Sequence, residues 1–230
     1  MRLLAIETST EFCSAALWLD GVVRESHVLA GQKHSQLLLG QVQELLREAG
    51  LTVAELDGIA YGRGPGSFIG VRIACGVAQG LALGADVPVV GVTTLLALAA
   101  AAGQARVLAV LDARMGELYL AAYQRDGEDW REVLPPCLCR AETAPDLPGE
   151  GWLGVGSGFA AQGAALAARY AGQLAGVDAQ AVPQAGSVAR LAAREFAAGC
   201  GLDAALAQPL YLRDKVAQTT AERLAAGGAA

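Results

Sequence analysis

A short polar turn near the start of the chain has the residue types that hold phosphate or magnesium. The apolar run Leu3–Ile6 is followed by Glu7, Thr8, Ser9 and Thr10. Hydroxyls and backbone N–H groups in such a turn can hold phosphate oxygens, and carboxylates can hold Mg²⁺ through water. The same residues are also typical of an ordinary polar hairpin turn. The segment is therefore a candidate nucleotide loop with a purely structural alternative.

Two glycine-rich segments each stand between an expected strand and an expected helix. They are Gly62–Gly70 and Gly154–Gly158, and Gly156 and Gly158 are the candidate phosphate contacts of the second. Glycine admits backbone turns that are closed to other residues, and a helix N-terminus attracts anions. The Gly-Lys-Ser/Thr ending of a Walker loop is absent. A rigid connection between strand and helix remains the alternative for both segments.

The remaining candidates for chemistry are sparse. Asp112 and Arg114 stand at the end of an expected strand, where they could form a site or an exposed ion pair of little energetic value. The only histidines, His27 and His34, are not clustered with acidic residues, so no metal site is expected. Five cysteines without regular spacing are a poor disulfide framework, which favours a reducing cytoplasm.

Composition limits the class of protein. A chain of 230 residues with 53% hydrophobic and 17% charged residues can form one large domain or two small ones with a proper core. The net charge of -6 comes with no basic stripe, so direct binding of nucleic acid through its phosphates is not expected. The longest uncharged stretch, Val87–Ala105, is interrupted by Pro88 and Gly91 and is interpreted as a strand and a helix rather than a membrane span. No signal peptide is expected at the start.

Hydrophobic periodicity predicts two similar units. The expected strands are 3–6, 12–19, 22–29, 56–61 and 87–92, then 107–111, 117–124 and 153–156, with a short extended piece at 208–212. The expected helices are 35–49, 70–83, 93–102, 160–170 and 187–198, the last capped by Ser187. Helix 70–83 keeps several glycines, although each costs about 1 kcal/mol against alanine, so another backbone is expected to approach it. Because strand, turn, returning strand restarts near residue 103, a duplicated α/β protein is predicted.

Five segments together resemble the bacterial TsaB family, also called YeaZ. They are IETST, GRGPGSFIGVRIACGVAQGLALG, PVVGVTTLLALA, DARMGELYLAAYQRDG and PLYLRDKVA, and they span nearly the whole chain. The residues that carry the family signature are Gly64, Pro65, Gly66, Ser67, Phe68, Gly70, Asp112, Arg114 and Glu117. One departure is Ile69, where the family usually has threonine, which puts a hydroxyl-dependent role there in doubt.

The resemblance implies a duplicated actin-like ATPase fold of the ribonuclease H-like kind, in two domains. The expected domains are 1–103, which carries the partner interface, and 104–218, followed by a flexible tail at 219–230. The implied function is that of a non-catalytic partner that pairs with and activates TsaD, with TsaE, in threonylcarbamoyl transfer to the adenosine beside the anticodon of tRNA. The implied protein is cytoplasmic, forms a homodimer when alone and contacts tRNA only indirectly. It binds no cofactor tightly by itself, and ATP or ADP would sit at a composite site with its partners.

The catalytic pattern of the TsaD relatives does not carry over. After Glu-Thr-Ser those chains continue with Cys-Asp-Glu-Thr-Gly, whereas Phe12 and Ser14 here add bulk where a phosphate would need room. Their His-x-x-x-His metal pair is also missing, because His27 and His34 are seven apart. The alternative function is an ATP-dependent small-molecule kinase or ATPase of the same superfamily. A metalloprotease lacks its required zinc ligands.

The resemblance also implies that helices 35–49 and 70–83 form the partner interface. Small residues would allow close approach, and leucines would supply buried area. The residues expected to take part are Leu38, Val42, Leu45, Arg72, Gly76, Gln79 and Gly80. The competing interpretation assigns both helices to the core of their own domain.

Overall fold

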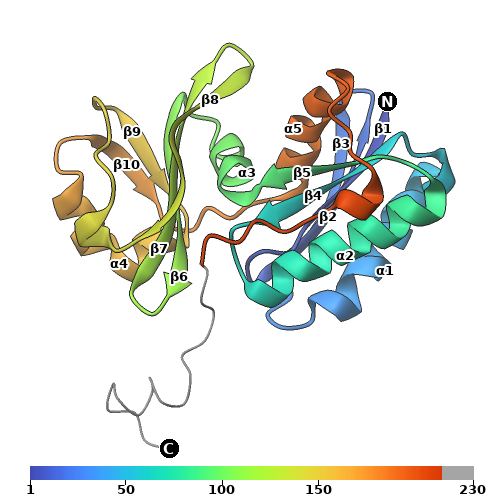
Figure 1. Ribbon diagram of the computed structural model, residues 1–230, viewed down its shortest axis with the longest axis horizontal. Helices are drawn as coiled ribbons and strands as arrows, with labels where there is room; N and C mark the ends of the chain where they lie inside the picture. Colours follow the sequence, from blue (N-terminus) through green and yellow to red (C-terminus); the bar gives the residue numbers. More distant parts are fainter. Residues whose placement is uncertain (214–230) are drawn as a thin grey trace, which may run out of the picture.

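The first half of the chain forms a five-stranded sheet with helices on both faces (Figure 1). The structure is a computed structural model, and it describes residues 1–213. The elements of this half are β1 (Arg2–Glu7), β2 (Phe12–Leu19), β3 (Val22–Leu29), α1 (His34–Ala49), β4 (Gly58–Gly64), α2 (Phe68–Ala85), β5 (Val89–Thr93) and α3 (Thr94–Ala101). The strand order is β3-β2-β1-β4-β5, with the first three strands antiparallel and the last two added in parallel.

The second half repeats this topology. Its elements are β6 (Arg106–Arg114), β7 (Glu117–Asp126), β8 (Asp129–Cys139), β9 (Trp152–Val155), α4 (Ser157–Arg169) and β10 (Leu174–Asp178). The order β8-β7-β6-β9-β10 matches β3-β2-β1-β4-β5 strand for strand and direction for direction. The predicted duplication, and with it the actin-like α/β fold, is confirmed.

The domain boundary expected at the C-terminal side is wrong. Helix α5 (Ala185–Ala197) returns to the first sheet, where Val188 and Ala192 pack in one cluster with Ala5 and Ala60. The second unit therefore ends near β10, and the chain crosses back to the first unit instead of continuing to residue 218. Ser187 does not cap this helix, because its N-cap is Gln184 and Ser187 is buried in the first turn. The expected tail 219–230 lies outside the described residues.

The two faces of the first sheet are covered differently. Helices α1 and α2 cover one face, where large residues such as Leu38 and Leu45 fill the core. Helix α5 covers the other face and meets it through alanines and valines. By length and mean hydropathy (1.5 over 18 residues), α2 could span a bilayer. Core helices of globular proteins meet the same criterion, and α2 packs in the first core through Ala74, Ala78 and Ala82.

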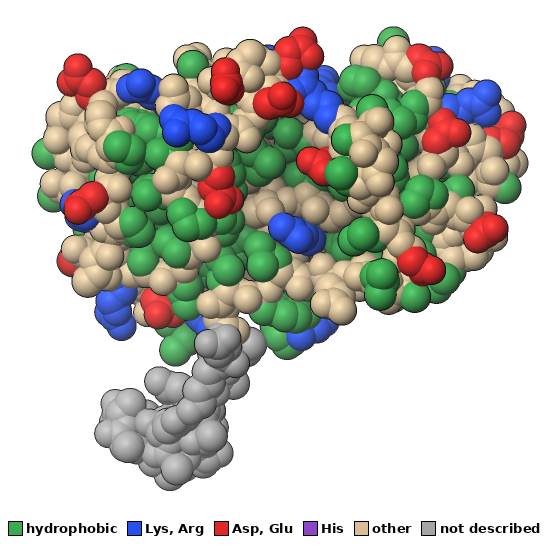
Figure 2. All heavy atoms as spheres, turned by 45° about the horizontal axis from the view of Figure 1, so that its top comes forward, with side chains coloured by type: hydrophobic (Ala, Val, Ile, Leu, Met, Phe, Trp, Pro, Cys, Tyr) green, Lys and Arg blue, Asp and Glu red, His purple; other side chains and the backbone are tan. Residues whose placement is uncertain are grey.

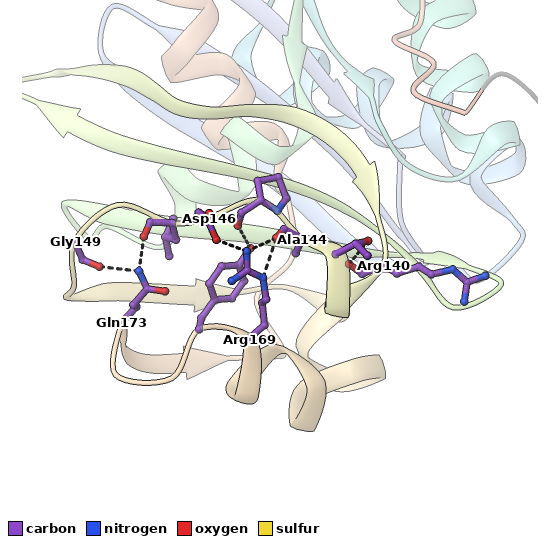
Figure 3. Close-up of polar contacts among 10 residues, drawn as sticks. Arg140, Ala144, Asp146, Gly149, Arg169 and Gln173 are labelled. Atoms are coloured by element: carbon purple, nitrogen blue, oxygen red, sulfur yellow. Dashed lines mark hydrogen bonds and ion pairs between the residues drawn. The ribbon is translucent and has the colours of Figure 1, made fainter.

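Polar contacts fix the long connection between β8 and β9 in the second unit (Figure 3). The guanidinium of Arg169 donates to the carbonyl oxygen of Ala144 at 2.6 Å and pairs with Asp146 at 2.5 Å. The side-chain amide of Gln173 donates to the carbonyl oxygen of Gly149 at 3.1 Å. The stretch 146–151 before β9 is a loop, held by side chains from the end of α4 and the turn after it.

Candidate functional site

The polar turn between β1 and β2 is locked to the glycine-rich loop that precedes α2. The Thr8 hydroxyl donates to the carbonyl oxygen of Gly70 at 2.7 Å, and the Ser67 N–H donates to the carbonyl oxygen of Ser9 at 2.7 Å. His34 closes the other side, since its Nε2 lies 2.9 Å from the carbonyl oxygen of Thr10. The two segments that could have held phosphate therefore hold each other.

Glycine is required in this loop because there is no space for a side chain. A Cβ on Gly70 would lie 2.0 Å from the carbonyl oxygen of Thr8, and one on Gly66 would lie 2.6 Å from that of Ser9. A Cβ on Gly62 would lie 1.9 Å from Oε2 of Glu7. The family-signature glycines thus serve close packing between loops. The glycine-rich loop and the turn therefore contact each other directly.

Glu7 is a fully buried carboxylate inside this locked turn. Its Oε1 accepts the Ser9 N–H at 2.6 Å, and its Oε2 accepts the Thr94 hydroxyl at 3.4 Å. Burial raises the pKa of the Glu7 carboxyl above its ordinary value of 4.5, and hydrogen bonding by Ser9 and Thr94 lowers it in part. A carboxylate enclosed in this way faces protein atoms, so its geometry suits a structural role.

Glu7→Gln is expected to remove a pH-dependent loss of stability. A carboxyl whose folded pKa is raised stabilises the fold fully below its unfolded pKa, and this contribution is lost as pH rises through the folded pKa. Wild type should therefore lose stability relative to the variant as pH rises above 4.5. Glutamine keeps both contacts, because its oxygen can accept from Ser9 while its amide donates to Thr94. Urea unfolding of both proteins between pH 4.5 and 8 measures this, and a difference that stays constant with pH would contradict it.

The second candidate loop is also filled by the protein itself. Cβ atoms on Gly156 and Gly158 would lie 2.5 Å from the carbonyl oxygen of Val110 and 2.4 Å from its Cγ1. Ser157 uses its hydroxyl to accept the N–H of Asp112 at 3.1 Å. The structural interpretation fits this loop, because its glycines let the start of α4 pack directly on β6.

The turn between β6 and β7 forms ion pairs rather than a cluster of reactive groups. Arg114 lies 3.1 Å from Asp112 and is 85% exposed, as the ion-pair alternative expects. Glu117 pairs with Arg213 at 2.5 Å, which the sequence did not predict. Arg213 belongs to the PLYLRDK segment, so this ion pair brings two family-signature segments together across 96 residues.

The same C-terminal segment lies over the start of α2. The Leu210 N–H donates to the carbonyl oxygen of Arg63 at 2.6 Å. The Arg72 guanidinium lies 3.3 Å from the centre of the Phe68 ring and 4.7 Å from that of Tyr211. Arg72, which was expected at the partner interface, therefore makes cation–π contacts with two aromatic rings of its own chain. The predicted extended piece 208–212 forms no strand, and these contacts hold it in place.

The structure corrects part of the expected partner interface. Leu38, Val42 and Leu45 are buried in the core of the first unit, so the competing interpretation holds for them. Gln79 is also engaged, because its amide donates to the carbonyl oxygen of Ala204 at 3.0 Å. These four side chains give their contacts to their own domain and leave little for a partner.

A different set of α2 residues remains open. In the described chain nothing lies within 4 Å of a Cβ built on Gly76 or Gly80, in contrast to the close approach found at Gly70. Ile69 is 69% exposed and Leu83 is 58% exposed. With the exposed Arg72, the spacing of these residues places them on one side of the helix. We call this set, Ile69, Arg72, Gly76, Gly80 and Leu83, the α2 stripe.

Metal-ligating residues are dispersed. Within residues 1–213 no three His, Cys, Asp or Glu side chains gather in a way that could hold a metal ion. All five cysteines have free thiols. Thr94 and Arg213, which complete the two polar networks above, were missed from sequence because they lie 87 and 96 residues from Glu7 and Glu117.

Comparison with known proteins gives consistent results over nearly the full length. The family described as "TsaD: tRNA N6-adenosine threonylcarbamoyltransferase" matches residues 21–229. The tRNA threonylcarbamoyladenosine biosynthesis protein TsaB of Escherichia coli is 43% identical, over 94% of this chain and 96% of that protein. The TsaB protein of Haemophilus influenzae is 38% identical over 94% of this chain and 95% of that one. The structure of YeaZ from Pseudomonas aeruginosa aligns with a TM-score of 0.83 at 38% identity, covering 92% of this chain and 99% of that one.

Proposed function

The chain belongs to the TsaB family of tRNA threonylcarbamoyladenosine biosynthesis proteins, and from this premise we propose that it is a non-catalytic partner of the transferase subunit. The observation that carries the proposal is the closed turn between β1 and β2. Ser9 and Thr8 are packed against Gly66 and Gly70 so closely that a single Cβ would overlap them. This close packing supports the proposal, because the backbone atoms of the turn are used to contact the second loop and not a phosphate.

The α2 stripe supplies the surface through which the partner role would work. Its glycines offer exposed backbone to a neighbouring helix, and Ile69 and Leu83 offer apolar area at either end. Apolar residues that become fully buried in an interface contribute strongly to its binding energy. The proposed partners are a TsaD-type transferase, with a TsaE-type protein joining the pair, and a second copy of this chain when the transferase is absent. Nucleotide would bind at a composite site, and the proposed location is the cytoplasm.

Contact with tRNA is proposed to be indirect. Figure 2 shows Lys and Arg side chains scattered among acidic ones on the face it presents, without a continuous basic stripe. Several arginines are neutralised inside the chain, including Arg169, Arg194 and Arg213. An acidic chain arranged in this way offers few phosphate contacts of its own.

Threonylcarbamoyl transfer to tRNA in a reconstituted system tests this proposal. Transfer is expected to depend on the chain, while the chain alone is expected to hydrolyse no ATP. Steady ATP turnover by the isolated chain would instead favour the kinase or ATPase alternative.

A further inference from the structure

A groove of about 690 Å³ opens between the two units at the β5 edge of the first sheet, lined by Tyr61 from the face that α1 and α2 cover and by Val90 and Val92 from the face that α5 covers. The outer edge of β5 lines it, together with the C-terminal half of α5, the start of β8 and the segment after α5. Its apolar lining includes Val90, Val92, Leu96, Trp130 and Leu191. Figure 2 shows a face on which hydrophobic side chains gather in the hollow between the two halves of the molecule.

The groove exposes a strand edge with free hydrogen-bonding groups. Strand β5 is the last strand of its sheet, and the carbonyl oxygen of Pro88 accepts the N–H of Ile59 on the inner side. The backbone N–H and C=O of Val89 point away from β4, and both form hydrogen bonds with Leu202 at 2.9 Å. Because backbone direction alternates along a strand, the N–H and C=O of Gly91 also point outward. No residue of the described chain pairs with them.

One cation in the groove lacks an acidic partner in the part of the chain that the structure describes. The Arg63 guanidinium lies 3.4 Å from the Thr93 hydroxyl and forms no ion pair there. Its stem crosses Gly91, since a Cβ on Gly91 would lie 3.2 Å from Cδ of Arg63. At the rim, by contrast, Arg194 is paired with both Glu128 and Asp129. The groove therefore presents the positive charge of Arg63 beside its free strand edge, while Glu195 adds a carboxylate elsewhere in the lining.

We propose that an extended segment of another protein chain adds to the edge of β5 in this groove, with a carboxylate facing Arg63. The short pairing of Leu202 with Val89 already forms the first step of such a strand, and the free groups of Gly91 continue the same edge. Peptides that add to a sheet edge gain affinity from main-chain hydrogen bonds and specificity from pockets for alternate side chains. The inference goes beyond the partner role through α2, because the proposed segment binds at the β5 edge and no residue of the α2 stripe lines the groove.

A random octapeptide library displayed on phage, selected against the full chain, tests this inference. Enriched peptides are expected to alternate apolar side chains and to carry Asp or Glu. A synthetic enriched peptide should slow hydrogen exchange of the Gly91 amide at least about tenfold, as local protection does. Gly91→Pro removes the outward N–H, fixes φ and adds a ring whose Cβ would lie 3.0 Å from Tyr61, and it should abolish binding. Gly91→Ala is the matched control, because it adds a similar Cβ and keeps the N–H. Arg63→Ala should remove the preference for acidic peptides.

Three results would overturn the inference. One is enrichment that is equal on wild type and on a folded Gly91→Pro variant. Another is protection of the Gly91 amide in the free chain that disappears when the chain is ended after Arg213, which would make its own C-terminal residues the occupant. The last is protection that disappears on dilution, which would make a second copy the occupant. None of these depends on pairing with the transferase, so failure here and failure of the partner role are distinguishable.

Discussion

Gly76→Arg is expected to weaken pairing with a TsaD-type transferase by at least about 100-fold, or about 2.7 kcal/mol. Gly76 lies in the middle of the α2 stripe, where nothing in the described chain comes within 4 Å of a built Cβ. An arginine there would hold a neighbouring helix away from the backbone and add a second charge beside Arg72 in the middle of the contact. The fold should survive, because replacing glycine inside a helix gains up to about 1 kcal/mol of helix propensity. Titration calorimetry with the purified transferase measures the change.

Gly163→Arg is the matched control for that experiment. Gly163 is also a helix glycine with nothing within 4 Å of a built Cβ, but it lies on α4 in the second unit. It should leave pairing unchanged. Unchanged pairing by a folded Gly76→Arg protein would remove the α2 stripe from the interface.

Gly70→Ala is expected to destabilise the protein by more than about 3 kcal/mol, the upper end of the usual cost of overpacking. The new Cβ would lie 2.0 Å from the carbonyl oxygen of Thr8, a backbone atom that cannot turn aside. Relief would require the turn between β1 and β2 to move away from α2, breaking the bond between the Thr8 hydroxyl and the carbonyl oxygen of Gly70. The free energy of unfolding in urea measures the loss.

Gly76→Ala on the same helix is expected to change the free energy of unfolding in the opposite direction. Its Cβ meets nothing within 4 Å, so alanine should stabilise the fold by up to about 1 kcal/mol. If Gly70→Ala and Gly76→Ala changed the free energy of unfolding alike, close packing at Gly70 would not be what fixes the turn between β1 and β2 against α2.

Local sequence patterns were enough to predict most of the elements and their duplication. Strands β1 to β3 and helix α1 have clear period-two or helical spacing, with Gly21 in the turn after β2 and Gly50 at the end of α1. Strands β8 and β10 were not predicted. β8 contains Pro135 and Pro136, which a strand tolerates only because β8 lies at the edge of its sheet. The return of α5 to the first sheet depends on contacts between residues such as Ala189 and Ala16, which are far apart in sequence.

The candidate site could be predicted only as a set of alternatives. Hydroxyls and glycines at residues 7–10 and 62–70 fit a phosphate loop and a packed turn equally well, since both need close backbone approach. The short distances from Cβ atoms built on Gly66 and Gly70 to the carbonyl oxygens of Ser9 and Thr8 favour the packed turn. Helical periodicity gave α1 and α2 an apolar face, but it does not say whether that face meets the same chain or another. Leu38 and Leu45 meet the same chain, and the stripe around Gly76 is left open.

The transfer of threonylcarbamoyl to tRNA by purified components, run with a TsaD-type transferase, a TsaE-type protein, threonylcarbamoyl-adenylate and ATP, tests the central claim most directly. It compares reactions without the chain, with wild type, with Gly76→Arg and with Gly163→Arg. Transfer is predicted with wild type and Gly163→Arg and lost in the other two, although all chain variants remain folded. Equal transfer in the absence of the chain would contradict the account.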